Sequence, residues 1–530
     1  MSDQALGAFT TRGPWVVDPA AMSWRNGVEQ VRADAASGVP ALVRPRRQPP
    51  GRAFTVLARL APPVLRWVVR HRFAVKTAKA QDDLPRRLRP AFERLGCTYI
   101  KLGQLIASAE GMAPAAWTTG FRDLHDRVGP EPFRHVRRVV ERDLGQSLDE
   151  VFATFDRTPL AAASIAQVHA ATLKTGEPVV VKVQRPDIAK LVAKDLATLT
   201  WLVGVIERRS PQAAIANLPA YLELFADTIV EELDFRLEAQ NMLDVAAVLA
   251  TAEDRVIVVP RPHPQVVTRR VLVMERIDGH ALDSEQALNA AGIDAAPVLR
   301  ALMVSFLEGA IIHGVFHGDL HAGNMLVDGH GQVAVFDFGI TGRLTPAQRR
   351  ALTGLLFQGM AGDPYGFLKG FRDLGGLPPD TDVTAFGREI DIESLMRNTG
   401  TALSPDEMAL QMQAATAALV TRGARLPKEL FLVIKGLTYL SGAVSRVASQ
   451  VDMTTELAHL AAYFAQQHSV ELLAADLNLD ALSDGERVAA NLRNQMGGTD
   501  ETMTLQEMQD ASRVQQEELR RARRALKQKK

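Results

Sequence analysis

Hydrophobic positions change their spacing twice along the chain, which predicts a helix-rich region, a small sheet and a second helix-rich region. From about residue 51 to 150, apolar residues recur at helical spacing. Valine-rich runs then favour β-strands at 178–184, 255–260 and 269–277. Between the first two runs, apolar residues at helical spacing predict one long amphipathic helix over 219–248.

Helical spacing returns after residue 279 and is interrupted once. Helices are expected in "APVLRALMVSFLEGAIIHGVF", at 346–360 and at 404–465, and "NMLVDGHGQVAVFD" predicts a hairpin with Asp328 and Gly329 at its turn. We therefore expect an α+β chain with five segments. In order they are a flexible N-terminal extension (1–50), a helical extension (51–150), a small β lobe (151–278), a helical lobe (279–465) and a polar, basic tail (466–530).

The composition limits the location and the partners of the protein. The 61 basic residues balance 61 acidic residues, so the charge gives no indication of nucleic-acid binding. Cys97 is the only cysteine, which excludes a disulfide within the chain and fits the reducing cytoplasm. No signal peptide is expected. The longest apolar stretches, 54–75 and 429–448, contain prolines or charged residues such as Lys435, so no transmembrane helix is expected.

Two polar stretches carry the residues for phosphoryl-transfer chemistry. "FHGDLHAGNMLV" contains Asp319 and Asn324, and "FDFG" adds Asp337. Asp319 is suited to orient an attacking hydroxyl group, while Asn324 and Asp337 offer the oxygen ligands that Mg²⁺ prefers. Gly339 is expected to let the backbone turn sharply after Asp337.

A lysine and a glutamate are needed to hold the phosphates in such a site. Lys182 lies in the predicted strand "VVVKV", and Glu238 on the long helix is its candidate partner. The alternative is a strand-edge lysine that reaches water. Spacing alone does not choose Glu238, because Glu231, Glu232 and Asp234 lie on the same predicted helix.

Three histidines four residues apart suggest a metal site as a second possibility. Gly314 and Gly318 interrupt any regular helix through His313, His317 and His321, and no cysteine or glutamate stands at ligand spacing. Core or loop-bracing histidines are the simpler interpretation.

The order lysine, glutamate, Asp-x4-Asn and Asp-Phe-Gly matches the protein-kinase pattern, with three departures. Alanines 161–163 stand where a kinase has glycines, so the loop over the phosphates is expected to be stiffer. Gly318 replaces the arginine that usually precedes the catalytic aspartate. A helix expected from Pro346 leaves almost no room for an activation segment. A protein substrate is therefore disfavoured.

Four further motifs resemble the UbiB family of atypical kinase-like proteins, called ADCK proteins in animals. The resemblance runs from about residue 85 to 345. "YIKLGQLIAS" contains the Lys-x-Gly-Gln of this family, "AAASIAQVH" its alanine-rich loop, and "EELDFRLEAQN" its Glu-x-Asp followed by the lysine partner. "HGDLHAGN" with "DFG" completes the set. The Arg-Pro-Asp that often follows the Lys-x-Gly-Gln helix is replaced by "ASAEGM".

This resemblance implies a bilobal protein-kinase-like fold, with a small five-stranded β lobe, a helical lobe and a family-specific helical N-terminal extension. It implies ATP or ADP and Mg²⁺ as cofactors, and a lid over the active site. The residues it assigns are, for catalysis, Asp319, Lys182 and Glu238; for the nucleotide, Ala161, Ala162, Ala163, Ser164, Lys182, Met274, Glu275 and Ile277; for the lid, Lys101, Gly103, Gln104, Glu232 and Asp234; and for the metal, Asn324 and Asp337.

Helix geometry agrees with the assignment of Glu232 to the lid and of Glu238 to Lys182. Six residues at 100° each place Glu238 roughly 120° away from Glu232, so one continuous helix would serve two partners. Lys101 and Gln104 would share one helix face.

The family resemblance implies an ATPase or lipid kinase that supports prenylated-quinone biosynthesis. Two alternatives stay open: a nucleotide-gated lipid-binding or scaffold module with little turnover, and a soluble small-molecule phosphotransferase. An isoprenoid or quinone-type lipid and the inner face of the plasma membrane are the expected partners. Residues 54–75 either lie on that membrane surface or dock on the lobes. The oligomeric state is open, with a homodimer among the options.

Overall fold

The structure falls into two compact units. The computed structural model describes residues 8–9, 15, 18, 21–44, 51–71, 78–108, 115–122, 124, 129–209, 218–251, 257–282, 285–290, 292–328, 332–393, 424, 427–447 and 453–473. The first unit comprises Met1–Ala250, Val259–Ile277 and Phe336–Ile340, and the second comprises the remaining segments. The helical extension therefore shares a unit with the sheet, and the break after Ile277 lies one residue before the expected lobe boundary.

An antiparallel sheet forms the centre of the first unit. Its order is β1 (Phe152–Phe155), β3 (Ala166–Leu173), β4 (Pro178–Gln184), β7 (Val271–Glu275) and β6 (Pro262–Val267), and the two-residue β2 (Ala161–Ala162) also pairs with β3. The expectation of a five-stranded β lobe is met by the five strands of the main path, with β2 as an addition. The predicted strand at 178–184 coincides with β4.

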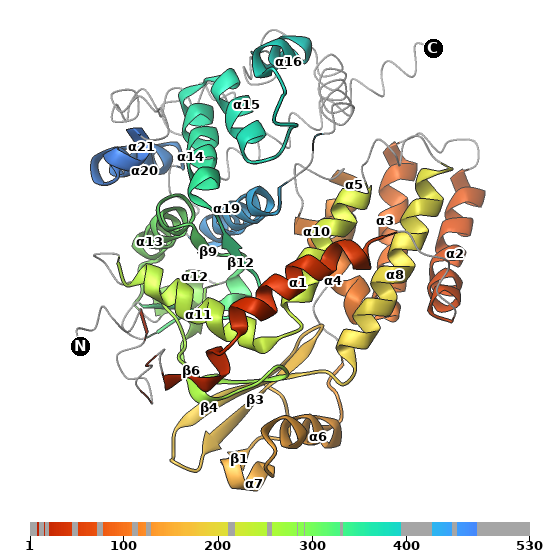
Figure 1. Cartoon of the computed structure of the whole chain (residues 1–530), viewed down its shortest axis with the longest axis vertical. Helices are drawn as coiled ribbons and strands as arrows, with labels where there is room; N and C mark the ends of the chain where they lie inside the picture. The colour runs from red at the N-terminus through yellow and green to blue at the C-terminus, as the bar shows by residue number, and fades with distance from the viewer. Residues whose placement is uncertain are drawn as a thin grey trace. The chain divides into compact units, whose positions relative to one another are not determined.

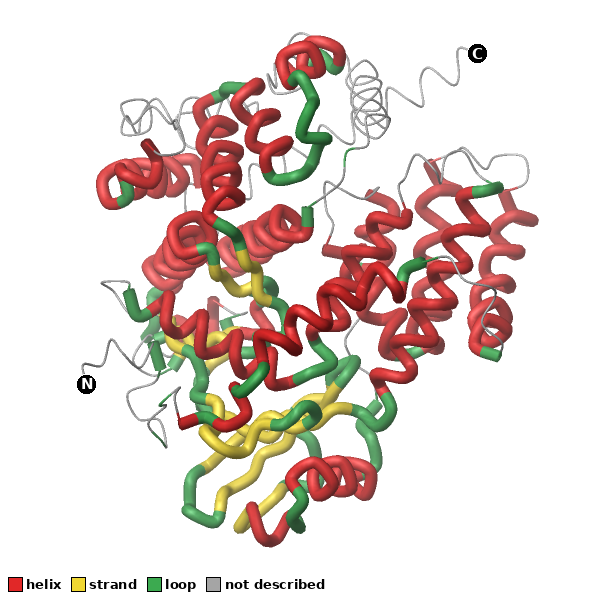
Figure 2. Tube along the Cα trace, viewed as in Figure 1, coloured by secondary structure: helices red, strands yellow, loops and turns green. Residues whose placement is uncertain are grey.

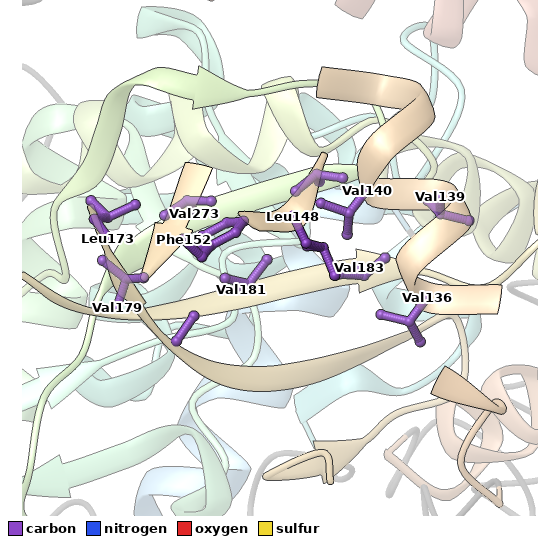
Figure 3. Close-up of a cluster of buried hydrophobic side chains, with 12 residues drawn as sticks. Val136, Val139, Val140, Leu148, Phe152, Leu173, Val179, Val181, Val183 and Val273 are labelled. Carbon is purple, nitrogen blue, oxygen red and sulfur yellow. The ribbon is translucent and has the colours of Figure 1, made fainter. Parts of the chain in front are cut away.

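Alternation along β4 decides which face of the sheet is hydrophobic (Figure 3). Val179, Val181 and Val183 are buried against α6 (Phe133–Leu144) and α7 (Leu148–Val151). Because successive side chains of a strand point to opposite faces, Lys182 lies on the other face of the sheet. The valine cluster thus fixes both the register of β4 and the direction of its lysine.

Helix α11 (Phe235–Leu249) packs on β6 and β7. The prediction of one helix over 219–248 is wrong, because α10 (Leu218–Glu231) ends before a turn at residues 232–233. Asp234 has an extended backbone and accepts a hydrogen bond from the backbone N–H of Arg236, so it caps the start of α11. Apolar spacing continues through this break, which is why the periodicity did not reveal it.

Figure 1 shows the N-terminal helices in red, orange and yellow, with α1 running at an angle to α2, α3 and α8. They are α1 (Val28–Leu42), α2 (Arg52–His71), α3 (Ala78–Leu95), α4 (Cys97–Ser108), α5 (Ala115–Phe121) and, from after the sheet's first strands, α8 (Ile188–Glu207). A buried ion pair between Arg52 Nε and Asp195 Oδ1, 2.5 Å apart, joins α2 to α8.

The prediction of a flexible extension over 1–50 differs from the structure for residues 21–44. A 3₁₀ turn (Ser23–Arg25) and α1 occupy this stretch, and Met22, Trp24 and Val28 are buried. Arg32 on α1 donates a hydrogen bond to Asn241 on α11. The abundance of Pro, Gly and Arg in this region concealed the apolar anchors.

The second unit is mainly helical, as Figure 2 shows by the predominance of red tubes around its short yellow strands. Its strands are β5 (Ile257–Val258), β8 (His280–Ala281), β9 (Val315–His317), β10 (Met325–Val327), β11 (Val333–Val335) and β12 (Thr341–Arg343). β10 and β11 form the predicted hairpin, while Gly329 at its turn lies outside the described residues. The valine run at 255–260 contributes β5, which pairs in parallel with β11.

The helices of the second unit include α12 (Glu285–Ala290), α13 (Ala295–Leu307), a π-helical segment (Glu308–His313), α14 (Pro346–Ala361), α15 (Pro364–Asp373), α16 (Val383–Glu389), α19 (Lys428–Val447), α20 (Met453–Gln467) and α21 (Ser469–Leu473). The predicted start at Pro346 is confirmed, and Thr345 caps it with Gln348. The predicted tail at 466–530 begins inside this helical part, since Leu472 is buried. Residues after 473 lie outside the described residues, as do 404–423, 425–426 and 448–452 of the predicted helical stretch.

One helix among the described residues, Ala295–His313, has the length and composition to cross a membrane, with a mean hydropathy of 1.7. Its most apolar window is 56% buried, and core helices pass the same test. The sequence pattern predicted a helix here but did not include it among the stretches considered as membrane spans.

Candidate functional site

Lys182 is held by two carboxylates in the first unit. Its Nζ lies 2.7 Å from Glu238 Oε1 and 2.7 Å from Asp337 Oδ1. The side chains of Lys182 and Glu238 are 9% and 4% exposed, whereas that of Asp337 is 43% exposed. The lysine is therefore not a strand-edge residue that reaches water, and it connects a buried glutamate to a carboxylate at the surface of the unit.

A second ion pair lies beside the first. Lys101 Nζ on α4 is 2.8 Å from Glu232 Oε1 in the turn between α10 and α11. Gly339 packs against this glutamate, because a Cβ on Gly339 would lie 3.3 Å from Glu232 Cγ. The structure thus divides the two glutamates between the two lysines as the resemblance implied. The helix geometry offered for this division does not apply, since the helix is broken between them.

These pairs leave the cluster with one negative charge in excess, because two ammonium groups face three carboxylates. Burial, together with the neighbouring charges of Asp337 and Glu232, raises the pKa of Glu238 to about 7 despite the favourable effect of Lys182. Burial likewise raises the pKa of Glu232. For Lys182, burial alone would lower the pKa, but the charges of Asp337 and Glu238 outweigh it and raise the pKa above its ordinary value. Lys182 therefore stays charged. Burial and the neighbouring negative charges act on the two glutamates instead, whose pKa values are raised.

The free energy of unfolding should therefore fall as the pH rises from about 4.5 to about 7. The folded-state pKa of Glu238, about 7, lies above its ordinary value, so the folded protein holds an extra proton in this window. The slope contributed by this one group is at most about 1.4 kcal/mol per pH unit. Chemical denaturation at a series of pH values measures it. Glu238→Gln should flatten the profile in this window, and an unchanged slope in the variant would contradict the assignment to Glu238.

The Asp-Phe-Gly segment turns at Phe338 and Gly339, directly after Asp337. Asp337 has a φ of 66°, in the left-handed region that Asp and Asn tolerate better than most residues. Gly339 is not itself at positive φ, and its lack of a side chain also allows the close approach of Glu232. The carbonyl of Phe338 accepts a hydrogen bond from Asn241 Nδ2 at 2.9 Å, which holds the segment against α11.

The alanine-rich loop is the turn between β2 and β3. Ala161 and Ala162 form β2, and Ala163 N–H donates to the carbonyl of Ala166. Arg185 Nε donates to the carbonyl of Ala163 at 3.2 Å, and its guanidinium also binds Glu131. The loop is therefore tied to the segment before α6, in addition to the stiffness that its alanines confer.

The remaining nucleotide candidates lie at opposite ends of the same sheet, because Ala166 pairs with Gln184 at one end of β4 and Glu275 pairs with Val179 at the other. Ser164 is buried in the turn after the alanines. Met274 and Glu275 are the last residues of β7, where Glu275 Oε2 accepts a hydrogen bond from Arg261 N–H, and half-buried Ile277 follows. Glu275 is thus engaged by the neighbouring strand.

The lid candidates differ in what they contact. Gly103 provides close packing, because a Cβ there would lie 2.4 Å from Leu124 Cδ2 and 3.0 Å from Phe121 Cδ1. Gln104 is half-buried on α4. Asp234 caps α11 and forms an ion pair with Arg236 at 2.7 Å. The structure therefore gives Asp234 a local role instead of the expected contact with the Lys-x-Gly-Gln helix.

Asp319 and Asn324 lie in the second unit, on a loop braced by its own histidines. His317 Nδ1 accepts from the backbone N–H of Asp319, and His321 Nδ1 accepts from that of Gly323, each at 3.0 Å. Asn324 Nδ2 donates to the carbonyl of Asp319 at 3.1 Å. His313 contacts Thr251 Oγ1. The loop-bracing interpretation of His317 and His321 is thus what the structure shows.

The donor chemistry of the two candidate metal ligands fits Mg²⁺. Asp337 offers a partly exposed carboxylate. Asn324 donates its hydrogen bond to the carbonyl of Asp319 through Nδ2, and a metal would instead bind its other side-chain atom, Oδ1. No group of three His, Cys, Asp or Glu side chains arranged to hold a metal ion is found in the described part of the chain.

The sequence analysis missed two side chains that shape this chemistry. Asn241, one helical turn after Glu238, positions the Asp-Phe-Gly backbone, and its signal was present in the "EAQN" of the quoted motif. Lys435 Nζ lies 3.0 Å from Asp319 Oδ1. Its signal was a lysine within an apolar helix pattern, which served only as an argument against a membrane span.

Comparisons with known proteins show similarity to kinase-like proteins. Residues 123–369 match the model of the ABC1 atypical kinase-like domain. An uncharacterised protein of Mycobacterium tuberculosis is 37% identical over 400 residues, which cover 73% of this chain and 79% of that protein. An uncharacterised chloroplastic aarF domain-containing protein kinase of Arabidopsis thaliana is 31% identical, covering 70% and 73%. A probable protein kinase UbiB of Marinobacter nauticus is 32% identical, covering 57% and 55%.

Proposed function

Because this chain belongs to the ABC1 atypical kinase-like family, which includes UbiB and aarF domain-containing kinases, we propose that it is a Mg²⁺-dependent, ATP-binding enzyme. We assign it ATPase activity or phosphoryl transfer to a small molecule or lipid, in support of prenylated-quinone biosynthesis or isoprenoid lipid handling. The observation that carries the proposal is Lys182, buried and held between Glu238 and Asp337. A kinase-like site uses such a lysine to neutralise the phosphates.

The proposed roles follow from the chemistry of each side chain. Lys182 binds the α- and β-phosphates and Glu238 orients it, while the alanine loop and residues 274–277 line the nucleotide. Asp337 and Asn324 hold Mg²⁺, which supplies charge neutralisation of the phosphates when bound. Asp319 orients the hydroxyl group or water that attacks. Lys101 with Glu232 secures α4 as part of a lid.

An anionic membrane surface is the proposed location, and the two faces of α2 support it. Ala53, Val56 and His71 on one face are buried, as expected for a docking helix. Phe54 and Leu65, 77% and 64% exposed, lie on the opposite face with Val68 and Val69 at 100° per residue. The exposed Arg59, Arg66 and Arg70 flank that face, and α2 contains no acidic residue. This arrangement suits the interface of an anionic bilayer.

The proposed activity predicts Mg²⁺-dependent release of phosphate from ATP, stimulated by anionic liposomes. Asp319→Asn should lower the rate at least tenfold and leave nucleotide binding within about twofold, because Asp319 acts on the nucleophile and not on the phosphates. Phosphate release and fluorescent-nucleotide binding measure the two effects. Neutral-lipid vesicles are the control for the membrane effect. Equal rates for the variant and the wild type would remove Asp319 from the mechanism.

The second candidate is a nucleotide-gated lipid-binding module with little turnover. The alanine loop favours it, because its carbonyl contact with Arg185 and its methyl groups restrict the movement that phosphate transfer requires. Nucleotide binding without phosphate release, in every lipid tested, would support this module over the enzyme.

Ala163→Gly tests the placement of the loop. Removing the methyl group should loosen the turn after β2 and change the ratio of ATP to ADP affinity by about threefold or more, since glycine recovers φ > 0 freedom. Isothermal titration with each nucleotide measures this ratio. Ala153→Gly, at an exposed position on β1 of the same sheet, is the matched control and should leave it unchanged.

A further inference from the structure

Lys435 is a buried cation in a helix that is otherwise part of the core of the second unit. Its neighbours Phe431, Leu432 and Val433 are each 1% exposed or less, and Lys435 itself is 7% exposed. Gly436 allows Phe306 of α13 to pack closely, because a Cβ on Gly436 would lie 2.4 Å from the ring. Burying an ammonium group is costly unless a counter-ion pairs with it. The position of Lys435 therefore requires an anionic partner.

That partner is the candidate catalytic carboxylate. Lys435 Nζ lies 3.0 Å from Asp319 Oδ1, and the two side chains are 9% and 16% exposed. The ammonium also lies 5.6 Å from the ring of Tyr439, and this ring is 6.0 Å from that of His321. α19 thus contacts the catalytic loop at two positions, at the carboxylate of Asp319 and two residues later at the bracing His321.

The chemistry of the loop explains why it needs a cation from elsewhere. Gly318 precedes Asp319, and the stretch 316–327 contains no lysine or arginine. A carboxylate that orients a nucleophile must be ionised and must be fixed in direction. An opposite charge nearby favours the ionised form, and an ion pair at 3.0 Å restricts the position of the oxygen that it contacts.

We propose that Lys435 is the positioning residue of Asp319. The ammonium holds Oδ1, so that the other oxygen, Oδ2, faces the attacking hydroxyl group in a constant direction. This role rests on the proposed function, because it presumes that Asp319 takes part in turnover. α19 lies outside residues 123–369, which match the family's domain model, so the loop of that domain obtains its cation from a later part of the chain.

Steady-state kinetics separates positioning from nucleotide binding. Lys435→Met keeps a side chain of similar length and should lower kcat about 30-fold, with KM for ATP within about twofold, because a misplaced catalytic group costs up to about 100-fold. Lys435→Arg restores the charge and should recover most of kcat. Lys428→Met, at the half-buried first residue of the same helix, is the control for charge removal. A wild-type kcat in Lys435→Met, or no recovery in Lys435→Arg, would overturn the inference.

A double-mutant cycle tests the pair without relying on turnover. Lys435→Met and Asp319→Asn should each lower Tm by several degrees, and the double variant should lose less than the sum, because neither partner is then left buried alone. Additive shifts would overturn the ion pair. If the Tm shifts of the variants are coupled but the wild-type protein shows no turnover, the ion pair stands. The proposed function, and the positioning role with it, would then be overturned.

Discussion

Asp337→Asn should abolish the Mg²⁺-dependent part of nucleotide binding, with a loss of about 100-fold or more in affinity for Mg-ATP. The substitution replaces a charged oxygen ligand with a neutral one and removes one of the two carboxylates at Lys182. Asparagine tolerates the left-handed backbone at φ 66° about as well as aspartate, so the fold should be retained. Titration of ATP with Mg²⁺ and with EDTA measures the difference.

Asp187→Asn is a matched control for this prediction. Asp187 has a φ of 54°, also in the left-handed region, and its side chain is 74% exposed and paired with Lys190. It therefore reproduces the change in charge and in backbone demand at a position away from the site. If Asp337→Asn bound Mg-ATP as tightly as the wild type, Asp337 would have no role in holding the metal. The proposed Mg²⁺-dependent function would then lack its charged metal ligand.

Lys182→Met should destabilise the first unit and remove nucleotide binding together. The substitution leaves Glu238, 4% exposed in its side chain, without its cation, and breaking such a buried pair typically costs about 3–5 kcal/mol. ATP binding should fall about 100-fold, because the phosphates lose their buried positive charge. Urea denaturation and nucleotide titration measure the two effects.

A double variant separates the two consequences of Lys182→Met. Lys182→Met with Glu238→Leu removes both members of the pair, so most of the stability should return while ATP binding stays lost. Recovery of binding in the double variant would show that Lys182 acts only as a structural counter-ion. A stability loss that persists in the double variant would mean that Lys182→Met perturbs the packing of β4 instead of leaving a charge unpaired.

The elements that sequence could predict are those whose signal lies in neighbouring residues. The valine run of β4 predicts both a strand and the face on which Lys182 lies, since strand alternation is a local property. Thr345, Pro346 and Gln348 predict the start of α14 in the same way, because a capping box involves only four consecutive positions.

The misplaced features depend on contacts between distant residues. In the turn between α10 and α11, Glu232 pairs with Lys101, more than a hundred residues earlier, and hydrophobic spacing carries no information about such a contact. The ordering of α1 depends on hydrogen bonds to α11. Lys435 could be recognised as significant only once Asp319 was seen beside it.

The turn at residues 232–233 has a mechanical consequence. Glu232 belongs to no helix. A displacement of Glu232 by its ion pair with Lys101 is therefore accommodated by rotation about the backbone torsions of residues 232–233, without bending α11. Glu238 lies in α11, beyond this turn, and can keep its ion pair with Lys182 when the Lys101–Glu232 pair opens. Opening the Lys101–Glu232 ion pair and breaking the Lys182–Glu238 ion pair are therefore two separate events.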